Sequence, residues 1–94
     1  MNEYPEISEY SLEVGIPESE ITGRSRRQDV VIAREVYWYI LSLHKMTCSE
    51  IVKLMNDGRV HQTIAHGISN IQGLIDVNHT LILPYLKIIE KFSR

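Results

Sequence analysis

Residues 56–67 combine a turn with side chains that can form hydrogen bonds without carrying a formal charge. His61 offers an imidazole, Gln62 an amide and Thr63 a hydroxyl, and such groups contact base edges and phosphates in DNA grooves. Residues 60–75 contain no Asp, Glu, Lys or Arg, although a helix face exposed only to water usually carries them. This stretch therefore favours a surface that lies against another molecule, and a DNA groove is the leading candidate.

A second group with binding chemistry is the basic run at residues 23–27, Gly-Arg-Ser-Arg-Arg. Arg24, Arg26 and Arg27 precede a predicted helix, at the end where the helix dipole favours anions rather than cations. Their charge is unfavourable for that helix, so another role is indicated. A phosphate or minor-groove contact is one interpretation, and a solvated loop is the other.

Patterns of catalytic and metal-binding residues are missing from the sequence. The four histidines lack a Cys or Asp partner at ligand spacing, and His61 and His66 are separated by about 140° around a helix. The single cysteine, Cys48, excludes an internal disulfide and a multi-Cys zinc site. Zinc-protease, P-loop and dinucleotide-binding motifs do not occur. We therefore expect no enzyme activity, no cofactor, no metal and no small-molecule substrate.

The composition is typical of one soluble domain, with 94 residues of which 44% are hydrophobic and 23% charged. No membrane span or signal peptide is predicted, so a cytoplasmic, nucleoid-associated bacterial protein is expected. The net charge of −2 conceals an asymmetry. Residues 1–22 contain six Glu and no Lys or Arg, giving −6, whereas residues 23–94 contain ten Lys and Arg against six acids, giving +4. The acidic segment is interpreted as a cap on the core or as a surface for a basic protein partner.

Apolar residues recur with a helical period along the chain and predict an all-α fold. Helices are predicted at residues 6–14, 17–21, 28–44, 47–55 and 60–75, with a last helix within residues 77–94. The segment at residues 28–44 is apolar over most of its circumference, which is typical of the central helix of a bundle. In the last segment Thr80 is predicted to cap the helix, with Pro84 in its first turn. The residues expected to close the core there are Leu81, Tyr85, Ile88, Ile89 and Phe92.

A helix-turn-helix motif is predicted in the second half of the chain. Thr47 and Glu50 form a capping-box pattern at the start of a short helix, and Gly58 lies in the turn that follows it. The next helix, at residues 60–75, carries the apolar stripe Ile64, Ile68, Ile71 and Ile75. In such motifs the second helix enters the major groove. Residues 1–94 are therefore predicted to form one domain, with an acidic cap (1–22), a basic loop, central helix and helix-turn-helix (23–76), and a C-terminal helix (77–94).

The segment from residue 7 to residue 75 resembles the C-terminal DNA-binding domain, domain IV, of the bacterial replication initiator DnaA. The matching motifs are Gly-Ile-Pro-Glu-Ser-Glu-Ile-Thr-Gly-Arg-Ser-Arg at 15–26, Ile-Ala-Arg-Glu-Val at 32–36, Ser-Glu-Ile at 49–51 and Gly-Arg-Val-His-Gln-Thr-Ile-Ala-His at 58–66. The resemblance implies an all-α helical bundle with a helix-turn-helix, like Trp repressor, that binds a short duplex element, the DnaA box.

The resemblance also implies roles for individual residues. Arg26 matches the arginine that the family places in the minor groove, and Arg24 and Arg34 match phosphate contacts. Ser49 matches a residue at the start of the first helix of the motif, near the DNA backbone. Arg59 and His66 also match the motif, where they serve packing as much as DNA contact. The predicted base contacts are Arg26, Val60, His61, Gln62 and Thr63. The predicted phosphate contacts are Arg24, Arg27, Arg34, Ser49, Lys53 and Arg59. Five or six contacts from the cations among them and Arg26 imply a log–log salt slope of roughly −5.

Departures from the family pattern indicate an altered target sequence. Val60 replaces an Asp and can offer a thymine methyl only an apolar contact, whereas Gln62 replaces Ser or Thr and suits adenine. The turn before Arg59 is one residue longer, and no ATPase domain is expected. We therefore expect a free-standing relative with altered or relaxed specificity for double-stranded DNA, not an initiator. The alternative is a protein-interaction module, a competitor or regulator of DnaA, that uses its acidic N-terminus and binds little DNA itself.

Overall fold

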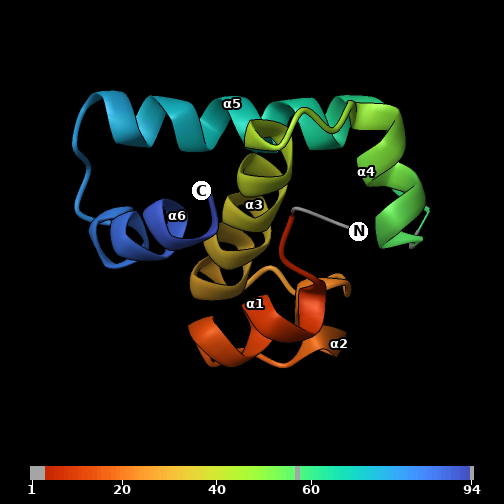
Figure 1. The fold of residues 1–94 in the computed structure, drawn as a ribbon, viewed down its shortest axis with the longest axis horizontal. Helices are drawn as coiled ribbons and strands as arrows, with labels where there is room; N and C mark the ends of the chain where they lie inside the picture. Colours follow the sequence, from red (N-terminus) through yellow and green to blue (C-terminus); the bar gives the residue numbers. More distant parts are fainter. Residues whose placement is uncertain (1–3, 57, 94) are drawn as a thin grey trace.

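The computed structural model describes residues 4–56 and 58–93, and in these ranges it contains six α-helices, one 3-10 turn and no strand (Figure 1). The elements are α1 (Ile7–Val14), α2 (Glu18–Ile21), α3 (Gln28–Leu43), α4 (Cys48–Met55), α5 (His61–Asp76), η1 (Leu83–Tyr85) and α6 (Leu86–Phe92). The predicted all-α fold is confirmed. Within the described ranges, no helix combines the length and the apolar character needed to cross a lipid bilayer.

Helix α3 is the centre of the bundle, as its apolar circumference predicts. Nine of its sixteen residues are buried. Figure 1 shows α5 crossing one end of α3, α4 beside it, and α1 and α2 near its other end. Every α-helix contributes buried residues to this core. They include Tyr10 of α1, Ile21 of α2, Ile51 of α4, Ile64 and Ile71 of α5 and Ile89 of α6.

Two buried tyrosines attach the N-terminal segment to α3. The Tyr10 hydroxyl donates a hydrogen bond of 2.6 Å to the carbonyl of Ala33, and the Tyr37 hydroxyl donates one of 3.1 Å to the carbonyl of Pro5. The two rings lie 4.9 Å apart between centroids. The segment before α2 is therefore part of the core rather than a loosely attached tail.

These tyrosines predict how stability depends on alkaline pH. Burial raises the pKa of Tyr10 and of Tyr37, so both keep their protons in the folded state when unfolded tyrosines have lost theirs. The folded state then binds more protons, so the free energy of unfolding is expected to fall as the pH rises through about 10. Tyrosinate absorbance and far-ultraviolet circular dichroism, recorded together along a pH titration, should show that two of the five tyrosines ionise only as the helices unfold. Ionisation of all five tyrosines with helicity intact would contradict this burial.

The C-terminal segment differs from its prediction. Thr80 does not cap a helix; residues 80–82 form turns, η1 follows with Pro84 in it, and α6 begins only at Leu86. The imidazole of His79 accepts a hydrogen bond of 3.1 Å from the Leu81 amide and so holds the backbone in a turn. The turn directs Ile82, which was not among the predicted core residues, into the core with no exposed surface.

Candidate nucleic-acid interface

The start of α5, with Val60 directly before the helix, presents the four predicted base-contacting residues of the motif to solvent. Val60 is 56% exposed, and His61, Gln62 and Thr63 are exposed as well. The next residue, Ile64, is fully buried and anchors the turn to the core. These four side chains therefore share one accessible surface at the N-terminal end of α5.

The remainder of α5 keeps the separation of faces that its sequence predicts. The uncharged polar face is exposed, and its residues are His66, Ser69, Asn70 and Gly73. On the opposite side, Ile64 and Ile71 are buried and Ile68 and Ile75 are partly buried. The helix thus has one face for the core and one uncharged face for solvent or a ligand.

A glycine sets how closely α5 approaches α3. Gly67 is buried, and a Cβ atom added there would lie 2.6 Å from Cε3 and 2.7 Å from Cζ3 of Trp38. The polar edge of the same crossing is closed by Asn70 Nδ2, which donates a hydrogen bond of 2.7 Å to Glu35. An isolated glycine in a helical pattern often marks close packing of this kind, but the sequence does not identify Trp38 as the partner.

The two helices of the motif begin in different ways. The capping box of α4 is confirmed: Thr47 accepts from the Glu50 amide at 3.2 Å, and Glu50 accepts from the Thr47 amide at 2.9 Å. Val60 occupies the same position before α5 and has no side-chain oxygen, so it cannot cap the helix. The side chain at this position thus leaves the first turn of α5 without a cap, and although the Thr63 amide donates to the Val60 carbonyl at 3.1 Å, the amides of His61 and Gln62 can donate to an external acceptor such as a phosphate.

Ser49 and His61 connect the N-terminal ends of these two helices. Ser49 Oγ lies 3.0 Å from His61 Nε2, and both side chains are exposed. A shallow hollow beside them is lined by Val52, Arg59, Val60, His61 and Gln62. Two predicted contact residues that are far apart in the sequence are thus joined on one surface.

Arg34 is buried and binds backbone carbonyls of α2 and of the basic loop. Its Nε donates to the carbonyl of Ile21 at 2.8 Å, Nη2 to that of Glu20 at 2.9 Å and Nη1 to that of Ser25 at 3.2 Å. Only 6% of Arg34 is exposed. The sequence does not predict this role for Arg34, because the carbonyl acceptors lie 9 to 14 residues away and belong to no motif.

Arg59 attaches the same loop to the helix-turn-helix. Its guanidinium donates to the carbonyl of Thr22 at 3.4 Å and to that of Gly23, and it lies over the Trp38 ring at 5.3 Å from the ring centroid. Burial, together with the nearby cations Arg34 and Arg24, lowers the pKa of Arg59 to about 10. This shift penalises the folded state at lower pH, and the penalty is relieved as the pH rises above about 10, in opposition to the effect of the buried tyrosines.

One cation of the loop, Arg24, lies next to the motif. Nη2 of Arg24 is 3.6 Å from the position that a Cβ on Gly58 would occupy, and Gly58 has a φ of 81° in the turn before α5. Asn56 also has a positive φ, of 50°, whereas Asp57 of this predicted turn lies outside the described residues. Arg24 therefore lies against the helix-turn-helix.

Arg26 and Arg27 are both exposed at the end of the loop. Arg27 forms two hydrogen bonds to Asp29, of 3.0 Å and 3.2 Å, and this contact is the main cause that lowers the pKa of Asp29. Lys53 is exposed on α4. Of the six predicted phosphate contacts, Arg24, Arg27, Ser49 and Lys53 thus have exposed side chains, whereas Arg34 and Arg59 are buried against carbonyls.

Comparison with known proteins gives one family and two similar proteins. The sequence model described as bacterial dnaA protein helix-turn-helix matches residues 6–71. The chain is 33% identical over 70 residues to the chromosomal replication initiator protein DnaA of Kosmotoga olearia, an alignment that covers 73% of this chain and 15% of that protein. It is 38% identical over 82 residues to that of Ureaplasma parvum, covering 85% of this chain and 18% of that protein. The chain thus spans less than a fifth of the length of these relatives. No solved structure matches it.

Proposed function

This chain belongs to the bacterial DnaA helix-turn-helix family, a family of DNA-binding domains, and from that premise we propose how it binds double-stranded DNA. The first turn of α5 enters the major groove, and Arg26 enters the adjacent minor groove. Binding of this kind needs the basic loop and the recognition helix to be held in a fixed relation, because the two grooves are read together.

The observation that carries this proposal is the attachment of the basic loop to the helix-turn-helix by Arg34 and Arg59. Their guanidinium groups bind five carbonyls between residues 20 and 25. The loop backbone is thereby positioned from two sides, by α3 and by the turn before α5. This arrangement supports a rigid two-part surface, in which the loop and α5 meet DNA without a separate ordering step.

The structure also supports a reassignment within the phosphate contacts. We assign Arg34 and Arg59 to positioning the loop, and we assign phosphate contact to Arg24, Arg27, Ser49 and Lys53, whose side chains are exposed. The uncapped first turn of α5 adds backbone amides to this set. Base contacts are assigned to Val60, His61, Gln62 and Thr63, with Gln62 directed to an adenine and Val60 to a thymine methyl group.

The salt dependence of binding tests this assignment. If Arg24, Arg27 and Lys53 at phosphates and Arg26 in the minor groove each release a counterion, the log–log salt slope should be about −3.5, against roughly −5 if Arg34 and Arg59 also do so. Fluorescence anisotropy of a labelled duplex at several salt concentrations measures the slope, and Lys53→Ala should reduce it by about 1. The proposal would be contradicted if the chain bound no duplex at low salt, or if its affinity did not change with salt concentration.

The roles of the two groove contacts are separable by selection of duplexes from a random pool. Gln62→Ala is expected to remove a preference for adenine at one position, worth about 1–3 kcal/mol. Arg26→Ala should instead weaken the preference for the adjoining minor-groove bases while leaving that adenine preferred. Ser69→Ala, a change on the exposed face farther along α5, serves as the control and should select the same sequences as the parent protein. An unchanged ranking with Gln62→Ala would show that Gln62 does not read a base.

The alternative function is a protein-interaction module that competes with or regulates DnaA. It is supported by the six glutamates of residues 1–22 and by the position of α1, near the end of α3 opposite to α5 (Figure 1). That separation also leaves the acidic surface accessible while α5 contacts DNA. The two functions are distinguished by the duplex-binding experiment, because the alternative expects little binding even at low salt.

A further inference from the structure

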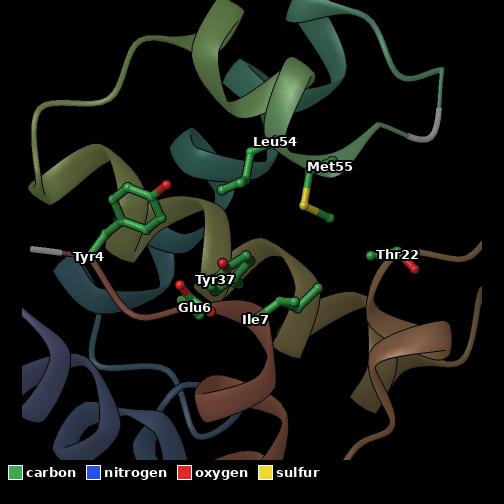
Figure 2. A pocket seen from close by; sticks show the side chains of 7 residues that line it. All are labelled: Tyr4, Glu6, Ile7, Thr22, Tyr37, Leu54 and Met55. Atoms are coloured by element: carbon green, nitrogen blue, oxygen red, sulfur yellow. The ribbon is translucent and has the colours of Figure 1, made fainter. Parts of the chain in front are cut away.

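A pocket of about 290 Å³ lies between the N-terminal segment and the first helix of the motif. In Figure 2, Leu54 and Met55 extend into it from α4, Tyr4 lies on the side opposite to Thr22, and Tyr37 lies at its base with Glu6. None of these side chains belongs to the surface assigned to DNA. The pocket therefore requires its own explanation.

The size and lining of the pocket suit one large apolar side chain. Its volume is at the lower limit for small-molecule sites, which usually measure about 300–1,000 Å³. Tyr37 and Met55 are almost fully buried, whereas Leu54 is 41% exposed at the opening. A rigid base with an exposed apolar edge is the arrangement that receives an anchor residue from a partner protein.

The negative charge near the pocket indicates which charge a partner should carry. Glu6 is part of the pocket lining. Burial is the main cause that raises the pKa of Tyr37, followed by the nearby Tyr4 and by the negative charges of Glu6, Glu9 and Glu18, so negative charge acts at the base of the pocket. Residues 1–22 contain no Lys or Arg to offset them. On the opposite side of the pocket Thr22 is followed by the basic loop, whose arginines repel cations. Positively charged groups of a ligand are therefore favoured only on the side of Glu6.

We propose that this pocket binds a basic peptide segment of a partner protein, with one Leu- or Phe-sized side chain inserted beside Leu54 and lysines or arginines over Glu6. The apolar anchor supplies the affinity, and the glutamates supply attraction and orientation. The site lies outside the residues assigned to DNA contact, so the proposal stands or fails independently of DNA binding.

The proposal is tested with short synthetic peptides and an isotope-labelled sample of the whole chain. Each peptide has one central Leu, Phe or Ala, with Lys or Glu on one side and Ser on the other. Amide chemical shifts in the NMR spectrum give both the location and the affinity. We expect Lys-flanked Leu and Phe peptides to shift the amides of Tyr4, Ile7, Leu54 and Met55, and to bind about tenfold more tightly than the Ala peptide.

Matched variants then distinguish the pocket from general surface attraction. Leu54→Gln should weaken binding about tenfold, whereas Leu43→Gln, at a leucine that is also 41% exposed but lies on α3, should leave it unchanged. Thermal melting verifies that both variants fold. Glu6→Gln should reduce the preference for Lys-flanked over Glu-flanked peptides.

Three results would overturn the proposal. The first is equal affinity for the Leu and Ala peptides, because the pocket would then contribute nothing. The second is a set of shifts at Gln62 and Thr63 rather than at the pocket. The third is a set of concentration-dependent shifts at the pocket without peptide, because the occupant would then be a second copy of this chain.

Discussion

Gly67→Ala is expected to lower the free energy of unfolding by about 2 kcal/mol, although alanine is the better helix former by about 1 kcal/mol. The added methyl would lie 2.6–2.7 Å from two carbons of the Trp38 ring and 3.1 Å from Cγ of Glu35. Trp38 is itself 2% exposed, so its ring has little room to move away. Thermal unfolding should therefore show a midpoint lowered by about 10 °C.

The same helix provides a control for this change. A Cβ added at Gly73 would meet no atom within 4 Å. Gly73→Ala should therefore stabilise the chain by about 0.5–1 kcal/mol through helix propensity alone. If both alanine variants stabilised the chain equally, the close approach of α5 to α3 would be wrong.

Gly67→Ala should also reduce DNA affinity under conditions in which the variant remains folded. To remove the overlap, α5 must move away from α3, and this movement displaces its first turn relative to the basic loop. Small displacements of positioned groups weaken recognition that depends on two grooves at once. Anisotropy measured at a temperature well below the melting transition separates this effect from unfolding, and Gly73→Ala again gives the reference.

Arg59→Lys is expected to lower stability by about 2–3 kcal/mol, although it preserves the charge. Lysine has no planar fork with which to bind the carbonyls of Thr22 and Gly23 while lying over Trp38. Both the unsatisfied carbonyls and the lost ring contact contribute to this cost. The loop should lose its fixed position, and we expect affinity for duplex DNA to fall about tenfold or more.

The matched control is Arg26→Lys, the same substitution in an exposed side chain of the loop. It should leave the melting temperature unchanged and alter only DNA binding. A simple phosphate contact at Arg59 makes the opposite prediction for Arg59→Lys, namely unchanged stability with a modest loss of affinity. Urea unfolding and anisotropy of the two variants, measured side by side, decide between the positioning and the phosphate roles of Arg59.

Features of this fold that depend on nearby residues were predictable from the sequence. The Thr47–Glu50 capping box joins residues three apart, and the apolar circumference of α3 is a property of one helix. The separation of the α5 faces is of the same kind. The predicted contact residues of the first α5 turn are exposed for this reason, because the helical period places Ile64 inward.

Features that depend on where helices meet were not predictable in this way. Arg59 binds carbonyls 36 and 37 residues away, and backbone carbonyls leave no trace in the sequence. Gly67 packs against Trp38, and the apolar pattern of α3 predicts only that Trp38 is in the core, not which residue it contacts. The C-terminal turn depends on the side chain of His79 competing with helix geometry, which propensity alone does not reveal.

The way in which Arg34 and Arg59 bind the loop has a consequence for how this domain can change. Both arginines donate hydrogen bonds to main-chain carbonyls, which every amino acid possesses. The path of the loop therefore depends on residues other than those assigned to base contacts. Side chains at positions 26 and 27 can therefore be exchanged without rebuilding the scaffold that carries them. The backbone of the loop can therefore stay the same while its exposed side chains change, so that minor-groove preference can diverge between relatives or be redesigned.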